Sequence, residues 1–240
     1  MSLSSHDQQR AKEAVGNHAA GLVQNGMRVG LGTGSTTAFA IEAIGRRVRD
    51  EGLQIIGVPT SFAAEQRARK WGIPLGTLEE LSRLDLALDG ADEFDPALNL
   101  IKGGGAAHTR EKIVAGQADQ FIVLADPTKE VEKLGTTRAL PVEVLPMAVG
   151  PVTRALNALG ASVEIRTGSG KDGPVVTDQG LWILDATFSA GINDAAAMDA
   201  KIVQMPGVLD HGLFVGMATT VLLAEPDGTT RSLGASLATH

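Results

Sequence analysis

Carboxylates and a lysine accompany a run of glycines in this 240-residue chain. Asp89 and Asp92 lie in the segment DGADE, directly after an apolar run. Lys102 opens the segment KGGGAAHTREK, which also contains Glu111. A carboxylate and a cation brought to one pocket can transfer a proton and stabilise the negative charge that results. Three consecutive glycines cost backbone entropy, so they favour a binding loop over a filler. These four residues are therefore candidate site residues.

A second glycine-rich segment, GLGTGST, connects an apolar run to a predicted helix. The free N–H groups at a helix start, together with hydroxyl side chains, form a site for an anion. Thr33, Gly34, Ser35 and Thr36 are therefore candidate phosphate ligands. The segment lacks the GK[ST] ending of a P-loop and does not match the GxGxxG dinucleotide fingerprint. It predicts a site for one phosphate, or else a tight turn with a capping hydroxyl.

Each of these segments also has a simpler interpretation. Asp89-Gly90 is a common turn pair, and acids that follow a strand are usually solvated. Lys102 and Glu111 could form a surface charge pair beside a flexible loop. Lys129 follows another apolar run and could reach a phosphate, but a solvated lysine in a turn is the more common case. Local sequence leaves both interpretations open at each of these positions.

The composition excludes several function classes. The chain has 21 basic and 28 acidic residues and only 3% aromatic residues, which argues against nucleic acid and against an anionic membrane surface as partners. It has no cysteine and no HExxH pattern, so we expect no metal and no cofactor. There is no apolar run of membrane-spanning length and no secretory signal, so the expected location is cytoplasmic.

Apolar periodicity predicts alternating strands and helices in the first half of the chain. Strands are expected at 27–31, 53–58, 84–88, 98–101 and 121–124, and helices at 5–25, from about 35 to 49, 62–71 and 109–118. This alternation is typical of a parallel sheet covered by helices on both faces. The predicted fold class is α/β, with a doubly wound, mostly parallel, Rossmann-like sheet.

The pattern changes near Gly135. Strands at 140–144, 162–166, 181–184 and 207–209 alternate with helices at 147–159 and 194–204, in the order β-α-β-β-α-β. This order is that of a ferredoxin-like α+β unit. We therefore expect a smaller inserted domain at 135–205, and a larger domain at 1–134 and 206–240. Segments 213–223 and 230–233 are expected to be strands that rejoin the larger sheet.

Taken together, these segments resemble ribose-5-phosphate isomerase of the A type, over nearly the whole chain. The strongest matches are GLGTGST at 30–36, DGADE at 89–93 and KGGGAAHTREK at 102–112. Further matches are FIVLADPTK at 121–129, LPVEVLPMA at 140–148, and PGV and GLF within 206–214. The resemblance implies metal-independent interconversion of ribose 5-phosphate and ribulose 5-phosphate, in the non-oxidative pentose phosphate pathway. It also implies a homodimer.

The resemblance assigns a role to each candidate residue. Glu111 matches the proton acceptor, and Asp89 is the candidate for opening the sugar ring. Lys102 would stabilise a cis-enediolate oxygen, and Asp92 would hold a substrate hydroxyl or orient Lys102. The implied substrate ligands are Thr33, Gly34, Ser35, Thr36, Asp89, Gly90, Ala91, Asp92, Lys102, Gly103, Gly104, Gly105 and Lys129. His108 departs from the family pattern, because many relatives carry an apolar residue there.

Two other protein classes stay open. A sugar-phosphate-sensing or effector-binding domain without catalysis could share the fold, although no basic helix-turn-helix accompanies it here. An acyl or CoA transferase of similar architecture would need a nucleophile and a longer acceptor pocket. Within the isomerase class, metal-assisted hydride transfer is the rival mechanism, and the acids at 89–93 are a thin basis for such a metal site.

Overall fold

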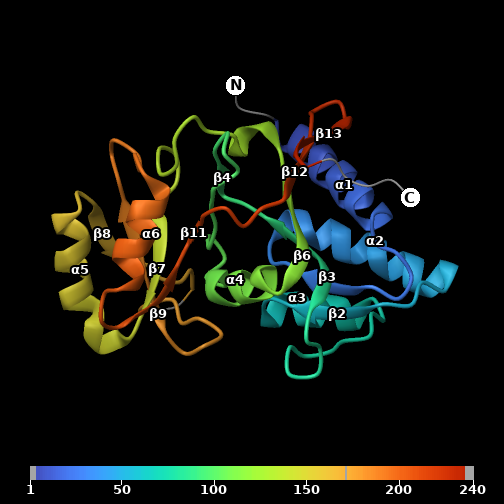
Figure 1. The fold of residues 1–240 in the computed structure, drawn as a ribbon, viewed down its shortest axis with the longest axis horizontal. Coiled ribbons are helices and arrows are strands. Elements are labelled where there is room, and N and C mark those ends of the chain that lie inside the picture. The colour runs from blue at the N-terminus through green and yellow to red at the C-terminus, as the bar shows by residue number, and fades with distance from the viewer. Residues whose placement is uncertain (1–3, 171, 236–240) are drawn as a thin grey trace. The chain divides into compact units, whose positions relative to one another are not determined.

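The computed structural model describes residues 4–170 and 172–235. The chain forms two compact units, and three segments of the sequence contribute to the larger one: 4–91, 110–130 and 217–235. The smaller unit consists of Asp92–Thr109 and Val131–Gly216. The chain therefore passes from one unit to the other several times, and Figure 1 labels most of the helices and strands.

The larger unit is built on a six-stranded sheet with the order β13-β12-β6-β3-β1-β2. The strands are β1 (Arg28–Leu31), β2 (Ile56–Pro59), β3 (Leu84–Gly90), β6 (Ala118–Ala125), β12 (Thr220–Ala224) and β13 (Thr230–Gly234). All neighbours pair in parallel except the edge strand β13, which is antiparallel to β12. The expected parallel α/β sheet is confirmed, and the two C-terminal strands β12 and β13 do rejoin it.

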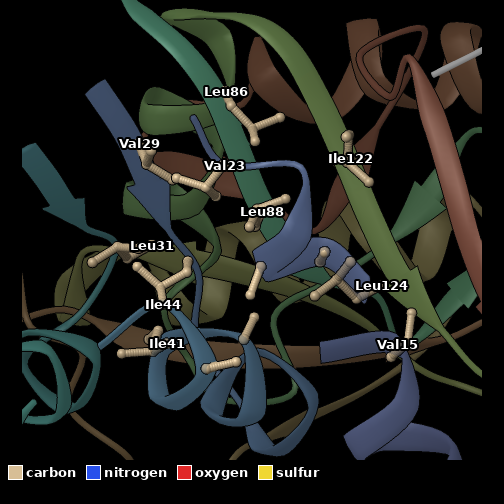
Figure 2. Packing of buried hydrophobic residues seen from close by; sticks show 14 of the residues in the cluster. Val15, Val23, Val29, Leu31, Ile41, Ile44, Leu86, Leu88, Ile122 and Leu124 are labelled. Atoms are coloured by element: carbon tan, nitrogen blue, oxygen red, sulfur yellow. The ribbon is translucent and has the colours of Figure 1, made fainter. Parts of the chain in front are cut away.

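Helices pack on both faces of this sheet. They are α1 (Ser5–Gly21), α2 (Ser35–Glu51), α3 (Phe62–Lys70) and α4 (His108–Gly116). Figure 2 shows apolar side chains of α1 and α2 against those of β1, β3 and β6, which form the main buried cluster. On the other face, α4 lies so close to β1 that a Cβ atom at Gly30 would be 2.6 Å from Cγ1 of Val114. Glycine at that position lets the helix approach the sheet.

The smaller unit contains a four-stranded antiparallel sheet with the order β10-β7-β9-β8. Its elements are β7 (Leu140–Val144), α5 (Val149–Ala158), β8 (Ser162–Ile165), β9 (Trp182–Thr187), α6 (Ala195–Val203) and β10 (Val208–His211). This is the β-α-β-β-α-β order expected of a ferredoxin-like unit. The chain also contains two short 3₁₀ helices, η1 (Pro127–Lys129) in the larger unit and η2 (Pro146–Ala148) in the smaller.

A second, three-stranded sheet in the smaller unit was not expected. It joins β4 (Glu93–Phe94), β5 (Leu100–Ile101) and β11 (Leu213–Phe214) in antiparallel pairs. The prediction of one strand over 213–223 is therefore wrong, because its first residues pair with β5 and its last residues form β12. The prediction that 98–101 belongs to the parallel sheet fails for the same reason.

This pairing also affects the extent of the units. Segments 92–109 and 206–216 pack with the smaller unit, because β5 pairs with β11 and β10 pairs with β7. The expected domains placed both segments in the larger part, and the domain boundaries themselves stay a prediction. No helix among residues 4–170 and 172–235 is long and apolar enough to cross a membrane.

Candidate functional site

Four parallel strands of the larger unit end beside polar residues. β1 is followed by the glycine-rich turn, β2 by Thr60 and Ser61, β3 ends at Asp89-Gly90, and β6 is followed by Asp126. The carboxyl ends of parallel strands share one edge of the sheet, and ligands of open α/β sheets bind along that edge. The sheet order places the ends of β2, β1, β3 and β6 next to one another, in that order.

The helix that follows the glycine-rich turn begins without a side-chain cap. Gly34 is the N-cap residue of α2, with φ of 114°, and it supplies no capping side chain. By contrast, Ser4, Ser61 and Asp194 each cap a helix through a side-chain oxygen. The first N–H groups of a helix need an acceptor, and an anionic ligand can supply one. Thr33, Gly34, Ser35 and Thr36, at the end of β1, are thus a candidate anion site.

The turn is tied to the end of β3 by Asp89. The buried Asp89 carboxylate accepts hydrogen bonds from the backbone N–H of Thr33 at 3.0 Å and of Gly90 at 2.7 Å. A Cβ atom at Gly32 would overlap this carboxylate and the carbonyl of Leu88. Gly32 is therefore required for the close approach of the two strand ends, and the structure brings Asp89 together with the predicted turn.

Two hydroxyl groups that the sequence analysis did not select also contact the turn. The Thr33 hydroxyl lies 2.8 Å from that of Thr60 and donates to that of Ser61 at 2.7 Å. Both partners are buried, and Ser61 also caps α3 by accepting from the N–H of Ala64. Their position just after a predicted strand was the signal that could have identified them.

Lys129 ends the 3₁₀ helix η1, which follows β6. Asp126 caps this helix by accepting from the N–H of Thr128 at 2.9 Å, and the N–H of Lys129 donates to the Asp126 carbonyl at 3.0 Å. The lysine side chain is half-buried. The backbone that carries Lys129 is thus fixed at the carboxyl end of a strand next to β3, as a ligand of a bound anion would need to be.

Glu111 lies in the first turn of α4 and is only 4% exposed. A carboxylate can accept a proton and return it, so Glu111 is a candidate for a group that exchanges a proton during a reaction. Val114, one turn further along α4, packs on the larger sheet and fixes the helix there. The adjacent residues Arg110 and Lys112 are less buried.

In the smaller unit, the triple-glycine turn is bound to Asp92. The Asp92 carboxylate accepts from the N–H of Gly104 at 2.8 Å, and a Cβ atom at Gly104 would lie 2.8 Å from that carboxylate. Gly103 has φ of 103°, and its backbone packs against the buried ring of His108. Both conditions demand glycine. The N–H of Gly104 therefore already has an acceptor in this structure.

Lys102 precedes this turn and is 3% exposed. Its N–H donates to the carbonyl of Gly212 at 2.9 Å, and its Nζ lies 5.5 Å from the centre of the Phe214 ring. A lysine ammonium group within about 6 Å of an aromatic ring centre is attracted to the ring face, which offsets part of the cost of its burial. Glycine at position 212 allows the two backbone segments to approach each other, because a Cβ atom there would overlap the Lys102 carbonyl.

Glu93, the third acid of the DGADE segment, has a structural role. It is fully buried and accepts from the N–H groups of Gly135 at 2.5 Å, Thr137 at 2.6 Å and Arg138 at 2.7 Å, and from the Thr137 hydroxyl at 2.6 Å. It therefore anchors the loop before β7. Among the residues that the structure describes, no group of three or more His, Asp or Glu side chains is arranged to hold a metal ion.

The fold and these strand-end residues define a doubly wound α/β protein with a candidate anion site and buried acids. The model of the family ribose 5-phosphate isomerase A (phosphoriboisomerase A) matches residues 56–228, and this chain belongs to that family. Ribose-5-phosphate isomerase A of Thermosynechococcus vestitus is 58% identical over 215 residues, which cover 89% of this chain and 91% of that protein. The Synechocystis protein of the same name is 56% identical, with the same coverage of both chains.

Solved structures of ribose 5-phosphate isomerases are also similar to this chain. Ribose 5-phosphate isomerase A of Methanocaldococcus jannaschii is 44% identical, with a TM-score of 0.89 over 93% of this chain and 98% of that one. A D-ribose-5-phosphate isomerase in complex with phospho-erythronic acid is 40% identical, with a TM-score of 0.90 over 93% of this chain and 97% of that one.

Proposed function

We propose that this chain interconverts ribose 5-phosphate and ribulose 5-phosphate through a cis-enediolate. One observation carries the proposal: the uncapped start of α2 adjoins Thr33, whose N–H is bound by the buried Asp89 carboxylate. An anion site and an acid–base group are thereby held side by side. Membership of the isomerase family gives the substrate class, and the neighbour bound to phospho-erythronic acid supports a sugar phosphate.

The substrate phosphate accepts hydrogen bonds from Thr33, Gly34, Ser35 and Thr36, with Lys129 as a further ligand. The first-turn N–H groups of α2 have partial positive charge and receive no side-chain cap from Gly34. The phosphate is not altered in the reaction, so these contacts bind the substrate and the transition state about equally. Gly90 and Ala91 line the sugar beside Asp89.

The reaction begins with ring opening and continues with one proton transfer between carbons. Asp89 takes the proton of the anomeric hydroxyl and passes it to the ring oxygen as the bond between C1 and that oxygen breaks, which leaves the C1 aldehyde. Glu111 then removes the proton on C2, and the electron pair forms the C1–C2 double bond of the enediolate. The hydroxyl proton on the oxygen of C2 passes to the oxygen of C1, and Glu111 returns the C2 proton to C1 while the oxygen on C2 becomes the carbonyl. One carboxylate can serve both carbons because they are adjacent.

Negative charge develops on the oxygen of C1 as the C2 proton leaves. Lys102 and the N–H groups of Gly103 and Gly105 stabilise it, in the way that donors stabilise an oxyanion elsewhere. The N–H of Gly104 is bound to Asp92, so that carboxylate holds the turn in place in addition to any contact with a substrate hydroxyl. No step in this mechanism requires a metal or a cofactor.

Direct assay tests the proposal. The purified chain is incubated with ribose 5-phosphate, with and without a chelator, and ribulose 5-phosphate is measured. We expect turnover that survives chelation. Tight binding of ribose 5-phosphate without turnover would support the sensing alternative, and turnover lost on chelation and restored by a divalent ion would support hydride transfer.

We further propose a cytoplasmic homodimer. The family resemblance supports this assembly, and exposed apolar side chains on the smaller unit are available to an interface, namely Leu145, Met147 and Leu209. Light scattering of the purified chain should give twice the mass of the 24.9 kDa polypeptide. A mass equal to that of one chain at micromolar concentration would contradict the dimer.

A further inference from the structure

Arg166 forms a fork-shaped ion pair with Asp185 in the smaller unit. Its Nε donates to Asp185 Oδ2 at 2.8 Å, and its Nη2 donates to Asp185 Oδ1 at 2.5 Å. Asp185 lies on β9, and the residue opposite it in the register of β8 is Glu164, two residues before Arg166. The arginine side chain is only 17% exposed. A guanidinium held at two points has a fixed orientation, because both bonds lie in its plane.

The remaining terminal nitrogen of this guanidinium reaches the triple-glycine turn. Nη1 of Arg166 donates to the carbonyl of Gly103 at 2.8 Å and to that of Gly104 at 3.2 Å. One side chain therefore connects the small antiparallel sheet to a turn that is 62 to 63 residues away in sequence. Lysine cannot replace this arrangement, since an ammonium group has no planar set of donors.

The turn needs such support because its backbone is strained. Gly103 has φ of 103°, and Ala106 has φ of 56°, a left-handed conformation that costs a non-glycine residue about 1 kcal/mol or more. Within the turn, the N–H of Ala106 donates to the Gly103 carbonyl at 3.0 Å. Gly104 is exposed, so packing does not hold it.

Arg166 and Asp92 hold the two ends of one peptide group. The carbonyl of Gly103 and the N–H of Gly104 belong to the same trans peptide, so they point in opposite directions. Arg166 binds the carbonyl end and Asp92 binds the N–H end at 2.8 Å. The next peptide has its Gly104 carbonyl held by Arg166, which directs the N–H of Gly105 away from the arginine. A cation on a carbonyl also makes the N–H of that peptide a stronger donor.

We propose that Arg166, oriented by Asp185, is a positioning residue that sets the direction and strength of the Gly104 and Gly105 N–H groups in the triple-glycine turn. This inference rests on the proposed isomerase function, because it predicts weaker stabilisation of the enediolate when Arg166 is lost. Arg166 is not proposed to touch the reacting atoms. It acts through the backbone of the turn.

The kinetic test uses three variants. Arg166→Met keeps the length and the apolar stem of the side chain but removes its donors. We expect kcat to fall about 10- to 100-fold, which is a smaller loss than deletion of an oxyanion donor causes. KM should change less than about threefold, because the affected contact forms mainly in the transition state. Arg166→Lys should recover little of the loss. Asp185→Asn should lower kcat by less than Arg166→Met does. The double variant Arg166→Met/Asp185→Asn should be no slower than Arg166→Met alone.

Arg28→Met is the matched control. Arg28 makes the same kind of fork with Asp85, with Nε–Oδ2 at 3.1 Å and Nη2–Oδ1 at 2.9 Å. Within the described residues it contacts no part of the turn, so its loss should leave kcat unchanged. Asp185→Asn preserves side-chain shape and keeps the kinetic test available if Arg166→Met does not fold. Normal kcat in a folded Arg166→Met or Arg166→Lys protein would overturn the proposal.

A second readout does not depend on activity. Hydrogen exchange of the Gly104 amide, followed by NMR, should be at least about tenfold faster in Arg166→Met than in the wild type. The reason is that Arg166 no longer binds the Gly103 carbonyl, which belongs to the same peptide group. Unchanged exchange would overturn the positioning role. Absence of turnover in the wild-type chain would instead reject the proposed function, and with it the kinetic consequence, while the exchange rate would still decide whether Arg166 holds the turn.

Discussion

Asp89 and Thr33 are joined by a hydrogen bond of 3.0 Å, from the backbone N–H of the threonine to the carboxylate of the aspartate. The bond connects the end of β3 to the turn after β1, across two adjacent strands of the parallel sheet. Gly32 makes it possible, since any side chain there would occupy the place of the Asp89 carboxylate. The same aspartate thus fixes the backbone of the glycine-rich turn and remains beside it.

The Asp89–Thr33 contact predicts that Gly32→Ala is severely impaired. The added methyl group must displace the Asp89 carboxylate or the Leu88 carbonyl, so kcat should fall by about 100-fold, the scale of one displaced acid–base group. Gly21→Ala is the control, because a Cβ atom there meets nothing within 4 Å. Steady-state kinetics would measure both, and a Gly32→Ala enzyme with normal kcat would show that the contact is dispensable.

Glu111→Gln should greatly slow proton transfer between C2 and C1. Glutamine keeps the shape and hydrogen bonding of this buried side chain but cannot accept the proton. The expected loss in kcat is about 10²- to 10⁴-fold, with little change in KM. In D₂O, the variant should also fail to exchange the C2 hydrogen of ribose 5-phosphate. Exchange at a wild-type rate would place the base elsewhere, and Asp89 or Asp92 would be tested next.

Thr36→Ala should weaken phosphate binding more than catalysis. The Thr36 hydroxyl lies at the uncapped start of α2, and phosphate contacts are shared by the ground and transition states. KM for ribose 5-phosphate should rise about tenfold while kcat changes less than about threefold, and the inhibition constant of inorganic phosphate should rise in parallel. Thr136→Ala, at an exposed threonine of the smaller unit, is the control. A loss confined to kcat would reject the phosphate assignment.

Glu93→Gln should destabilise the fold without removing a catalytic group. Four donors converge on the Glu93 carboxylate, and an amide would turn its NH₂ group toward some of them. Hydrogen bonds to a buried charged group contribute about 1.5–3 kcal/mol each, so a loss of about 2–4 kcal/mol is expected. Calorimetry should show a Tm lowered by about 5–15 °C. An unchanged Tm would mean that the loop before β7 is held by other contacts.

The Arg28–Asp85 pair predicts a pH dependence of stability. The hydrogen bond from Arg28 holds the pKa of Asp85 below its ordinary value, although partial burial acts in the opposite direction. The pair therefore stabilises the fold above the ordinary aspartate pKa of about 4, and this contribution is lost as the pH falls through the lowered pKa. The partly exposed pair contributes about 1 kcal/mol or less.

Denaturant unfolding of wild type and Asp85→Asn measures this contribution. The two free energies of unfolding should differ near pH 7 and converge below the lowered pKa, where Asp85 is protonated in both states of the wild-type chain. A difference that grows as the pH falls would contradict the direction of the pKa shift.

Much of the fold is encoded locally in the sequence. Apolar runs at strand spacing, alternating with helical periodicity, predicted the parallel sheet and the ferredoxin-like unit, because each element carries its own pattern. The glycine-rich turn and Asp89 could also be placed together, since each follows a strand and parallel strands end at one edge of the sheet. The site residues named from the sequence are therefore mostly those next to strand ends.

Tertiary structure alone decided the pairing of distant segments. Three acids within DGADE look alike in sequence, yet Asp89 binds Thr33, Asp92 binds Gly104, and Glu93 is enclosed by the loop at 135–138. Segment 213–223 reads as one strand but divides between two sheets. Arg166 carries no local signal, because its partners in the triple-glycine turn lie more than 60 residues away. Such contacts depend on which surfaces meet after folding, and no periodicity within a single element records that.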